Sequence, residues 1–310
     1  MGESAFSKIL VPLDGSETTE TILPYVSQLA KGLGAAVVVL AVLEESAYGW
    51  TASLRQGIDL EVEKAASKRL RNIVNQLHKG EVEAEGVTMK GRASEEIVRA
   101  ADRYGCDLIA MTTHGRNRIL RGILGSVSDE VVHASVSPVL LITPERAATY
   151  GGGWFRVFAK ATEGVMAKIM VPLDGSPEAE AVLPYVRVLA EKLSLSVLLV
   201  NVIPGANVEW LDWEKSGPED VDLHQRAEAE ADAYLEGISQ KLSDAGIDNR
   251  WQVHVGHPAR VLAQIAQLEP HDIIALSSRR GSRWTLGSVA ETLVRATGDP
   301  VLVITDNTSR

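Results

Sequence analysis

The fold is decided by the stretch Lys8-Ile-Leu-Val-Pro-Leu-Asp14-Gly-Ser16, which returns as Lys168-Ile-Met-Val-Pro-Leu-Asp174-Gly-Ser176. Two later stretches return in the same order: Leu124-Gly-Ser-Val127 as Leu286-Gly-Ser-Val289, and Pro138-Val-Leu-Leu-Ile142 as Pro300-Val-Leu-Val-Ile304. The offset is 160 residues for the first pair and 162 residues for the later pairs. A repeat of this length indicates a duplicated domain, because the units of solenoid proteins span roughly 20–50 residues.

The length agrees with this division, since 310 residues suggest two domains of about 150 residues each. We expect one domain at residues 1–145, a linker at 146–165 and a second domain at 166–310. The linker contains three consecutive glycines beside Tyr150, Trp154 and Phe155. These aromatic residues predict that it packs across the two domains.

The composition excludes several classes of protein. At 45% hydrophobic and 23% charged residues, the chain is typical of a soluble globular protein. Cys106 is the single cysteine, so no intrachain disulfide can form. The start of the sequence lacks a secretory pattern, and the longest apolar run, residues 35–43, is too short to span a membrane. We therefore expect a cytoplasmic protein without membrane contact. The net charge of −10 argues against nucleic-acid binding.

Apolar runs alternate with amphipathic stretches through both halves. Strands are expected at residues 9–13, 35–43, 82–90, 107–112 and 138–143, and again at 168–173, 197–203, 249–255, 272–277 and 300–305. This alternation predicts an α/β fold, with a parallel sheet covered by helices on both faces. Ser16 is expected to cap the first helix, whose interior Pro24 predicts a kink, as Pro184 does in the second half.

Ligands of open α/β sheets bind beyond the carboxyl ends of the strands, where the strand order reverses. Two loops fall there, at residues 12–16 and 112–128. In the second loop, glycines permit close approach of the backbone, and Gly125-Ser126 opens a helix whose free N–H groups suit a phosphate. Asp14, in the first loop, can accept hydrogen bonds from ribose hydroxyls. Together the two loops can hold both ends of a nucleotide.

Each of these residues also has a purely structural explanation. Asp14 alone is more often a turn residue, Gly125-Ser126 a helix cap, and the arginines of the second loop solvated charges. Their coincidence at two neighbouring loops favours a ligand site. Neither a dinucleotide-binding Gly-x-Gly-x-x-Gly nor a Walker motif is present. We interpret Cys106 as a core residue, and His254 and His257 as unrelated to metal binding.

The repeated motifs, together with Thr113-His-Gly-Arg116, resemble the universal stress protein family in its tandem two-domain form. The resemblance implies two open, parallel, five-stranded sheets of order 3-2-1-4-5. It also implies that the halves pair through their fifth strands as an intrachain pseudo-dimer, with a homodimer as a further option. Family members that bind ATP carry Gly-x2-Gly-x9-Gly-Ser/Thr. Here Thr112 stands at the first glycine, while Gly115, Gly125 and Ser126 complete the pattern.

The resemblance also implies roles for individual residues. Asp14 and Val42 would hold ribose and adenine, Val42 through its backbone, and the residues after Thr112 would hold ribose and phosphates. The residues expected at the nucleotide sites are Pro12, Leu13, Asp14, Val42, Met111, Thr112, Gly115, Arg116, Gly125, Ser126, Val127, Ser128, Asp174, Val202, Gly287, Ser288 and Val289.

The second half departs from the pattern. Its loop between Ala275 and Gly287 is three residues shorter than the loop between Ala110 and Gly125. Ala290 also replaces the hydroxyl of Ser128. Whether this half binds a nucleotide is left open by the sequence.

Three functions fit these features. The first is a stress-response module regulated by an adenine nucleotide (ATP, AMP or ADP, with or without Mg²⁺) and assigned no catalytic residue. The second is a slow ATPase or a phosphoryl or nucleotidyl transferase, supported by the arginines near Arg116, since arginine stabilises a transferring phosphoryl group. The third is a scaffold or dimerisation unit that binds no ligand.

Overall fold

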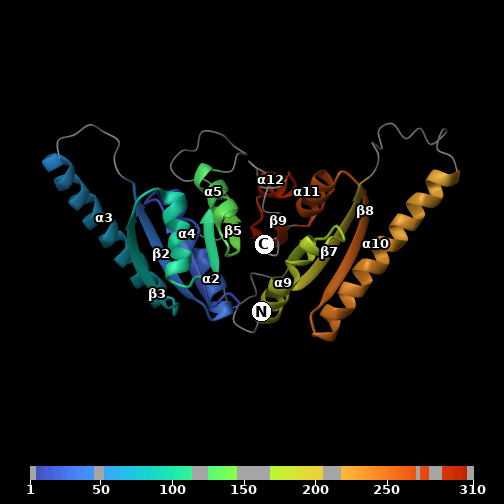
Figure 1. The fold of residues 1–310 in the computed structure, drawn as a ribbon. Coiled ribbons are helices and arrows are strands. Elements are labelled where there is room, and N and C mark those ends of the chain that lie inside the picture. Colours follow the sequence, from blue (N-terminus) through green and yellow to red (C-terminus); the bar gives the residue numbers. More distant parts are fainter. Residues whose placement is uncertain are drawn as a thin grey trace. The chain divides into compact units, whose positions relative to one another are not determined.

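The computed structural model describes residues 5–44, 52–113, 125–144, 168–204, 218–269, 273–278 and 288–305. Within these ranges, the side chains of residues 52–59, 218–224 and 288 are not described. The chain divides into two compact units, Met1–Gly164 (unit 1) and Val165–Arg310 (unit 2), blue to green and yellow to red in Figure 1. The expected linker at 146–165 lies outside the described residues.

Unit 1 holds a parallel sheet in the order β3-β2-β1-β4-β5. Its strands are β1 (Lys8–Leu13), β2 (Ala36–Leu43), β3 (Ala84–Lys90), β4 (Leu108–Thr112) and β5 (Val139–Ile142). Its helices are α1 (Glu17–Glu20), α2 (Leu23–Leu33), α3 (Ala52–Lys79), α4 (Ala93–Arg103) and α5 (Ser126–Ala134). The α/β fold and the 3-2-1-4-5 strand order expected for this half are confirmed.

Unit 2 repeats the same order, as β8-β7-β6-β9-β10. Its strands are β6 (Lys168–Pro172), β7 (Ser196–Pro204), β8 (Asn249–Gly256), β9 (Ile273–Ser278) and β10 (Val301–Thr305). Its helices are α8 (Pro177–Glu180), α9 (Leu183–Leu193), α10 (Pro218–Asp244), α11 (Pro258–Leu268) and α12 (Ser288–Thr297). The expected pairing of the two halves through their fifth strands stays a prediction.

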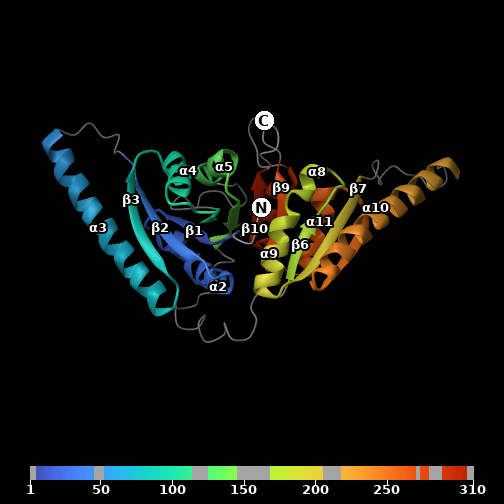
Figure 2. The same ribbon diagram turned by 60° about the horizontal axis from the view of Figure 1, so that its bottom comes forward.

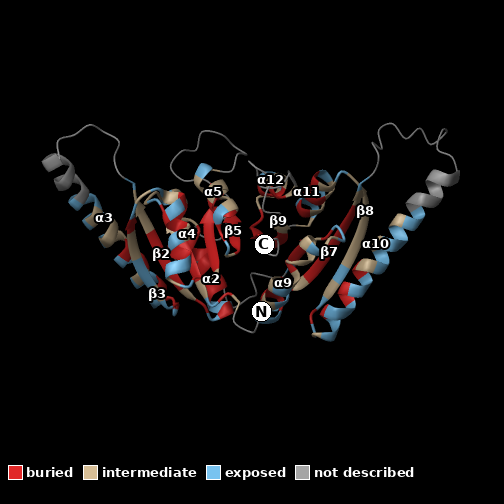
Figure 3. Cartoon of the chain, in the orientation of Figure 1, coloured by how far each residue is buried: buried red, intermediate tan, exposed pale blue. Residues whose placement is uncertain are grey.

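Helices cover both faces of the sheet in unit 1. In Figures 1 and 2, α4 and α5 lie together on one face, while α2 and α3 lie on the other. The strands between them are mostly buried, except for β3 at the edge of the sheet, and the outward surfaces of the helices are exposed (Figure 3). Burial of β1, β2, β4 and β5 on both faces explains why these strands read as continuous apolar runs. In the described parts of the chain, no helix is long and apolar enough to cross a bilayer.

The kink expected at Pro24 is wrong. The chain forms two separate helices there: α1 ends at Glu20, and α2 begins at Leu23 with Pro24 in its first turn. Pro184 occupies the same place in α9. A proline in the first turn loses no helical hydrogen bond, because the first N–H groups of a helix have no acceptor within the helix. The proline therefore starts a helix here and does not bend one.

A difference between the two units concerns the residue that ends the helix before the second strand. Gly34 ends α2 with φ +67°, and Ser194 ends α9 with φ 54°. This left-handed conformation is strained for a residue with a Cβ atom. A Cβ added to Gly34 would meet no heavy atom within 4 Å, so the effect is one of backbone conformation alone.

We predict that Ser194→Gly raises the free energy of unfolding by about 0.5–1 kcal/mol, because the strain exceeds the added entropy of the unfolded chain. The reciprocal change, Gly34→Ser, should lower it by about 1 kcal/mol. Urea-induced unfolding measures both. Destabilisation by Ser194→Gly would show that the serine side chain contributes to the cap.

Candidate functional site

The site is positioned by the separation of β1 from β4. β1 pairs with β2 as far as Leu13, whereas its described pairing with β4 covers Ile9 and Leu10. Residues 11–13 and 110–112 therefore continue beyond the paired segment toward the carboxyl edge. The loops that carry the candidate residues follow from these two ends, and α1, which follows Asp14, contacts β4. The described ends of the two expected loops thus lie at the same edge of the sheet.

Asp14 organises the first loop. Its Oδ1 accepts hydrogen bonds from the Ser16 amide (2.9 Å), the Ser16 hydroxyl (2.6 Å) and the Thr19 hydroxyl (2.8 Å). Gly15 completes the turn with φ 76°. Ser16 caps α1 as expected, its hydroxyl accepting from the Thr19 amide at 3.3 Å. The Asp14 side chain is held in place by its own turn and remains exposed to solvent.

The second loop is closed at its base. The Gly125 amide donates to the Thr113 carbonyl at 2.8 Å, and the Thr113 amide donates to the Ile142 carbonyl at 3.0 Å. Ser128, which is 3% exposed, donates its hydroxyl to the Thr113 carbonyl at 3.1 Å. The hydroxyl of Ser128 therefore ties α5 to the end of β4, a use that sequence reasoning did not anticipate.

Helix α5 begins at Ser126, as expected, with Gly125 as its cap. Gly125 has φ −61° and ψ 145°, so any residue could adopt its backbone conformation. The glycine also has no side chain to cap the helix. Among the described residues, the amides of Ser126 and Val127 have no acceptor, and the Ser126 side chain is exposed. Such amides, at the positive end of the helix dipole, are suited to an anion.

The other residues expected in unit 1 are distributed along the same edge. Met111 and Thr112 are buried at the end of β4. Pro12 and Leu13 end β1, and Val42 lies near the end of β2, paired with Met89. His114, Gly115 and Arg116, with the remaining arginines of the loop, lie outside the described residues.

Arg69 is a residue at this edge that sequence reasoning missed. It projects from α3 and donates from Nε to Glu20 of α1. This hydrogen bond, together with the charges of Glu20, Glu17 and Asp14, raises the pKa of Arg69 above its ordinary value. A cation carried by α3 therefore lies near Asp14. In the sequence, nothing distinguishes Arg69 from the neighbouring polar residues of α3.

Unit 2 reproduces the first loop more simply. Asp174 Oδ1 accepts from the amide (2.9 Å) and the hydroxyl (2.6 Å) of Ser176, but Ala179 stands where unit 1 has Thr19. Tyr234 stands where unit 1 has Arg69, at the same offset of 165 residues that relates buried Leu70 to Leu235. Burial, followed by the charges of Glu180 and Asp174, raises the pKa of Tyr234. The cation beside the aspartate is thus absent from this position in unit 2.

The second loop of unit 2 is only partly described. Ser277, at the end of β9, donates its hydroxyl to the Glu178 carbonyl at 2.5 Å, so the strand end is linked to α8. Val202 is buried in β7, and Val289 is half-buried in α12. Gly287 and the side chain of Ser288 lie outside the described residues. No group of His, Cys, Asp or Glu residues suited to a metal ion occurs in the described part of either unit.

Comparison with known proteins now decides the family. The sequence model of the universal stress protein family matches residues 5–143 and 166–305. The chain belongs to the universal stress protein family. It is 28% identical over 153 residues to universal stress protein MJ0577 of Methanocaldococcus jannaschii, an alignment that covers 44% of this chain and 94% of the relative.

Further relatives agree with a tandem universal stress protein. YxiE of Bacillus subtilis is 31% identical over 148 residues, covering 44% of this chain and 99% of the relative. The crystal structure of a universal stress protein from Archaeoglobus fulgidus aligns over 97% of this chain and 98% of its own, with a TM-score of 0.72 and 22% identity. This last likeness shows that the two chains share a fold.

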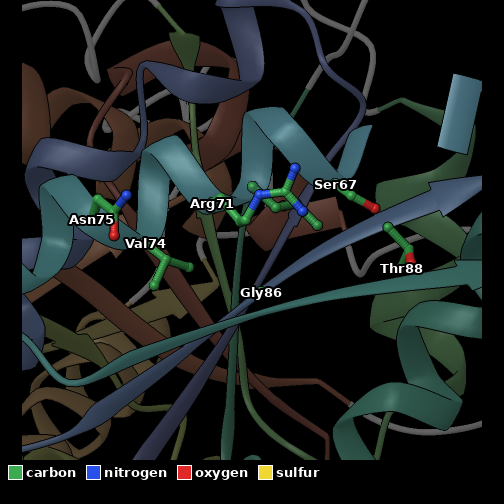
Figure 4. A pocket seen from close by; sticks show the side chains of 7 residues that line it. Ser67, Arg71, Val74, Asn75, Gly86 and Thr88 are labelled. Carbon is green, nitrogen blue, oxygen red and sulfur yellow. The ribbon is translucent and has the colours of Figure 1, made fainter. Parts of the chain in front are cut away.

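A separate hollow of about 320 Å³ lies between α3 and β3 of this universal stress protein (Figure 4). Arg71, Val74 and Asn75 line it from the helix, and Gly86 and Thr88 from the strand. In unit 2, Trp251 replaces Gly86, and its indole Nε1 donates to Asp232 of α10 at 2.8 Å. The hollow contains none of the residues expected at the nucleotide site.

Cys106 is a core residue, as the sequence indicated. It is 4% exposed, and burial raises the pKa of its thiol to about 11. The thiolate is the reactive form, so the folded protein holds this cysteine in its inert state at neutral pH.

We predict that the folded chain does not react with a disulfide reagent such as Ellman's reagent at pH 8, whereas the urea-unfolded chain reacts with one equivalent. The raised pKa means that Cys106 contributes stability below pH 9, which is lost as the pH rises toward 11. Stoichiometric labelling of the folded protein within minutes would contradict this assignment.

Proposed function

We propose that unit 1 binds an adenine nucleotide and that this universal stress protein acts as a nucleotide-responsive binding module. The observation that carries the proposal is the pair of loops at the carboxyl edge of the sheet. The exposed carboxylate of Asp14 follows β1, and the uncapped amides of Ser126 and Val127 begin α5 after β4. A carboxylate suits ribose hydroxyls, and helix amides suit phosphates.

Other members of the family supply precedents for the ligand class. One universal stress protein has been solved in complex with cAMP, and one from Arabidopsis thaliana has been solved with AMP bound. The cAMP and the AMP are ligands of those two proteins. For this chain, the proposal rests on its own residues at the strand ends. The binding experiment is to measure how affinity depends on the number of phosphates and on Mg²⁺.

Catalysis is not part of the proposal. A transferase or an ATPase needs groups that stabilise the transferring phosphoryl group, commonly with a metal ion. Among the described residues, no carboxylate cluster could hold such an ion.

We predict that isothermal titration calorimetry of the full chain detects ATP binding, and that Gly125→Ala weakens it about tenfold. Alanine can adopt the backbone conformation of Gly125, so the variant should fold and add one methyl group where the ligand approaches. Gly237→Ala is the matched control, because a Cβ there meets no heavy atom within 4 Å. The proposal fails if the folded wild-type chain takes up no nucleotide at millimolar ATP.

Asp14→Asn tests the other end of the site. Asparagine keeps an Oδ1 acceptor for Ser16 and Thr19, so the turn should survive, but the charge and one acceptor oxygen are lost. We expect affinity for ATP to fall about fivefold, with a change in unfolding free energy below about 1 kcal/mol. Equal affinity of Asp14→Asn and the wild type for ATP would remove Asp14 from the site.

A further inference from the structure

We propose that Ser94 and Glu130 are positioning residues for the nucleotide site of unit 1. Both lie away from the expected ligand contacts, on α4 and on the second turn of α5. Their hydrogen bond fixes where the amino terminus of α5 stands. The inference rests on the proposed function, since it explains how the same site is held ready for a phosphate.

The contact between α4 and α5 is a carboxylate held by two donors. Glu130 accepts from the Ser94 hydroxyl at 2.5 Å through Oε2, and from Arg92 Nη2 at 2.6 Å through Oε1. The Arg92 and Glu130 side chains are 61% and 41% exposed, so solvent screens much of that ion pair. Ser94 is 5% exposed. The hydrogen bond from Ser94 is therefore the stronger constraint of the two.

Helix α5 is thus held on two sides within its first five residues. Ser128 ties it to the end of β4, and Glu130 ties it to the first turn of α4. The amides of Ser126 and Val127 belong to the first turn, which contains Ser128 and directly precedes Glu130, so moving them would strain these bonds. A binding group that is fixed before the ligand arrives costs less entropy to order on binding.

The network reaches the end of β2. The Ala93 amide, at the start of α4, donates to Glu44 Oε1 at 3.2 Å. Glu44 lies two residues after Val42, whose backbone is expected at the adenine. The first turn of α4 therefore joins the strand end at one side of the site to the helix at the other.

Unit 2 lacks the equivalent side chains at every one of these positions. Proline replaces Glu44, histidine replaces Arg92, alanine replaces Ser94 and Ser128, and threonine replaces Glu130; the residues are Pro204, His257, Ala259, Ala290 and Thr292. Ala259 and Ala290 are both buried, as Ser94 and Ser128 are. The packing of the helices is thus retained in unit 2 without the carboxylate and hydroxyls that fix α5. The loss of the whole set indicates that these residues serve the site of unit 1 and are not needed for the fold.

The test compares ATP with adenosine. Ser94→Ala and Glu130→Ala, each of which removes the hydrogen bond between the two side chains, should weaken ATP binding about fivefold while leaving adenosine binding within about twofold, because the phosphates depend on α5. Calorimetry measures ATP binding, and competition against ATP measures adenosine binding. The double variant should be no weaker than the worse single variant, because both changes remove the same hydrogen bond.

Two matched controls separate positioning from general stability. Ser137→Ala removes a hydroxyl that donates to the Cys106 carbonyl at 3.0 Å. Cys106 precedes β4 and Ser137 precedes β5, so this bond lies at the amino ends of the strands, at the other edge of the sheet from the site. Glu81→Ala removes a carboxylate whose side chain is 90% exposed, between α3 and β3. Neither control should change the ratio of adenosine to ATP dissociation constants.

The outcomes distinguish the two proposals. If the wild-type chain binds no ATP, the proposed function fails and this inference fails with it. If the wild type binds ATP but the ratio of adenosine to ATP dissociation constants in Ser94→Ala and Glu130→Ala equals that of the controls, only the positioning role is overturned. An equal loss of ATP and adenosine binding also overturns it, since that pattern reports a structural defect of the whole unit.

Discussion

The whole candidate site depends on the parting of β1 and β4. From β1, the chain first builds outward through β2 and β3, and then returns past β1 to add β4 and β5 on the other side. The connections that follow β1 and β4 therefore lead to strands on opposite sides of this pair. Asp14, after β1, and the start of α5, after β4, lie at the carboxyl edge where the two strands part.

Much of this arrangement could be predicted from the repeated sequence. Buried parallel strands are continuous apolar runs, and Ser16 and Ser176 each begin a helix by capping it with the side-chain hydroxyl. The interpretation of Pro24 failed because a proline within an apolar periodic stretch can equally begin a second helix.

The polar contacts within the site could not be predicted. In the sequence, Ser128 is a possible hydrogen-bond donor to a phosphate. In the structure, its hydroxyl donates to the carbonyl of Thr113. Arg69, Ser94 and Glu130 are ordinary residues on amphipathic helices, and only the packing of those helices brings them to Glu20 and to each other. A sequence pattern identifies which face of a helix is buried, but not which polar side chain meets which partner across two helices.

The duplication gives each unit a natural comparison. Unit 2 keeps the strand order, the Asp174 turn and the buried strands, so these features belong to the fold itself. It has replaced Arg69 by Tyr234, Ser128 by Ala290 and Ser94 by Ala259. The two units therefore share a scaffold but differ in the charges and hydroxyls around the carboxyl edge. This asymmetry is the reason why we propose the nucleotide site in unit 1.

The most direct measurement is a titration of ¹⁵N-labelled protein with ATP, followed through the backbone amide shifts in nuclear magnetic resonance spectra. The account predicts saturable shifts at Ser126, Val127 and Ser128 and in the turn after Asp14, and much smaller ones at Ser288 and Val289. Unchanged chemical shifts of these unit 1 amides at saturating ATP would contradict it.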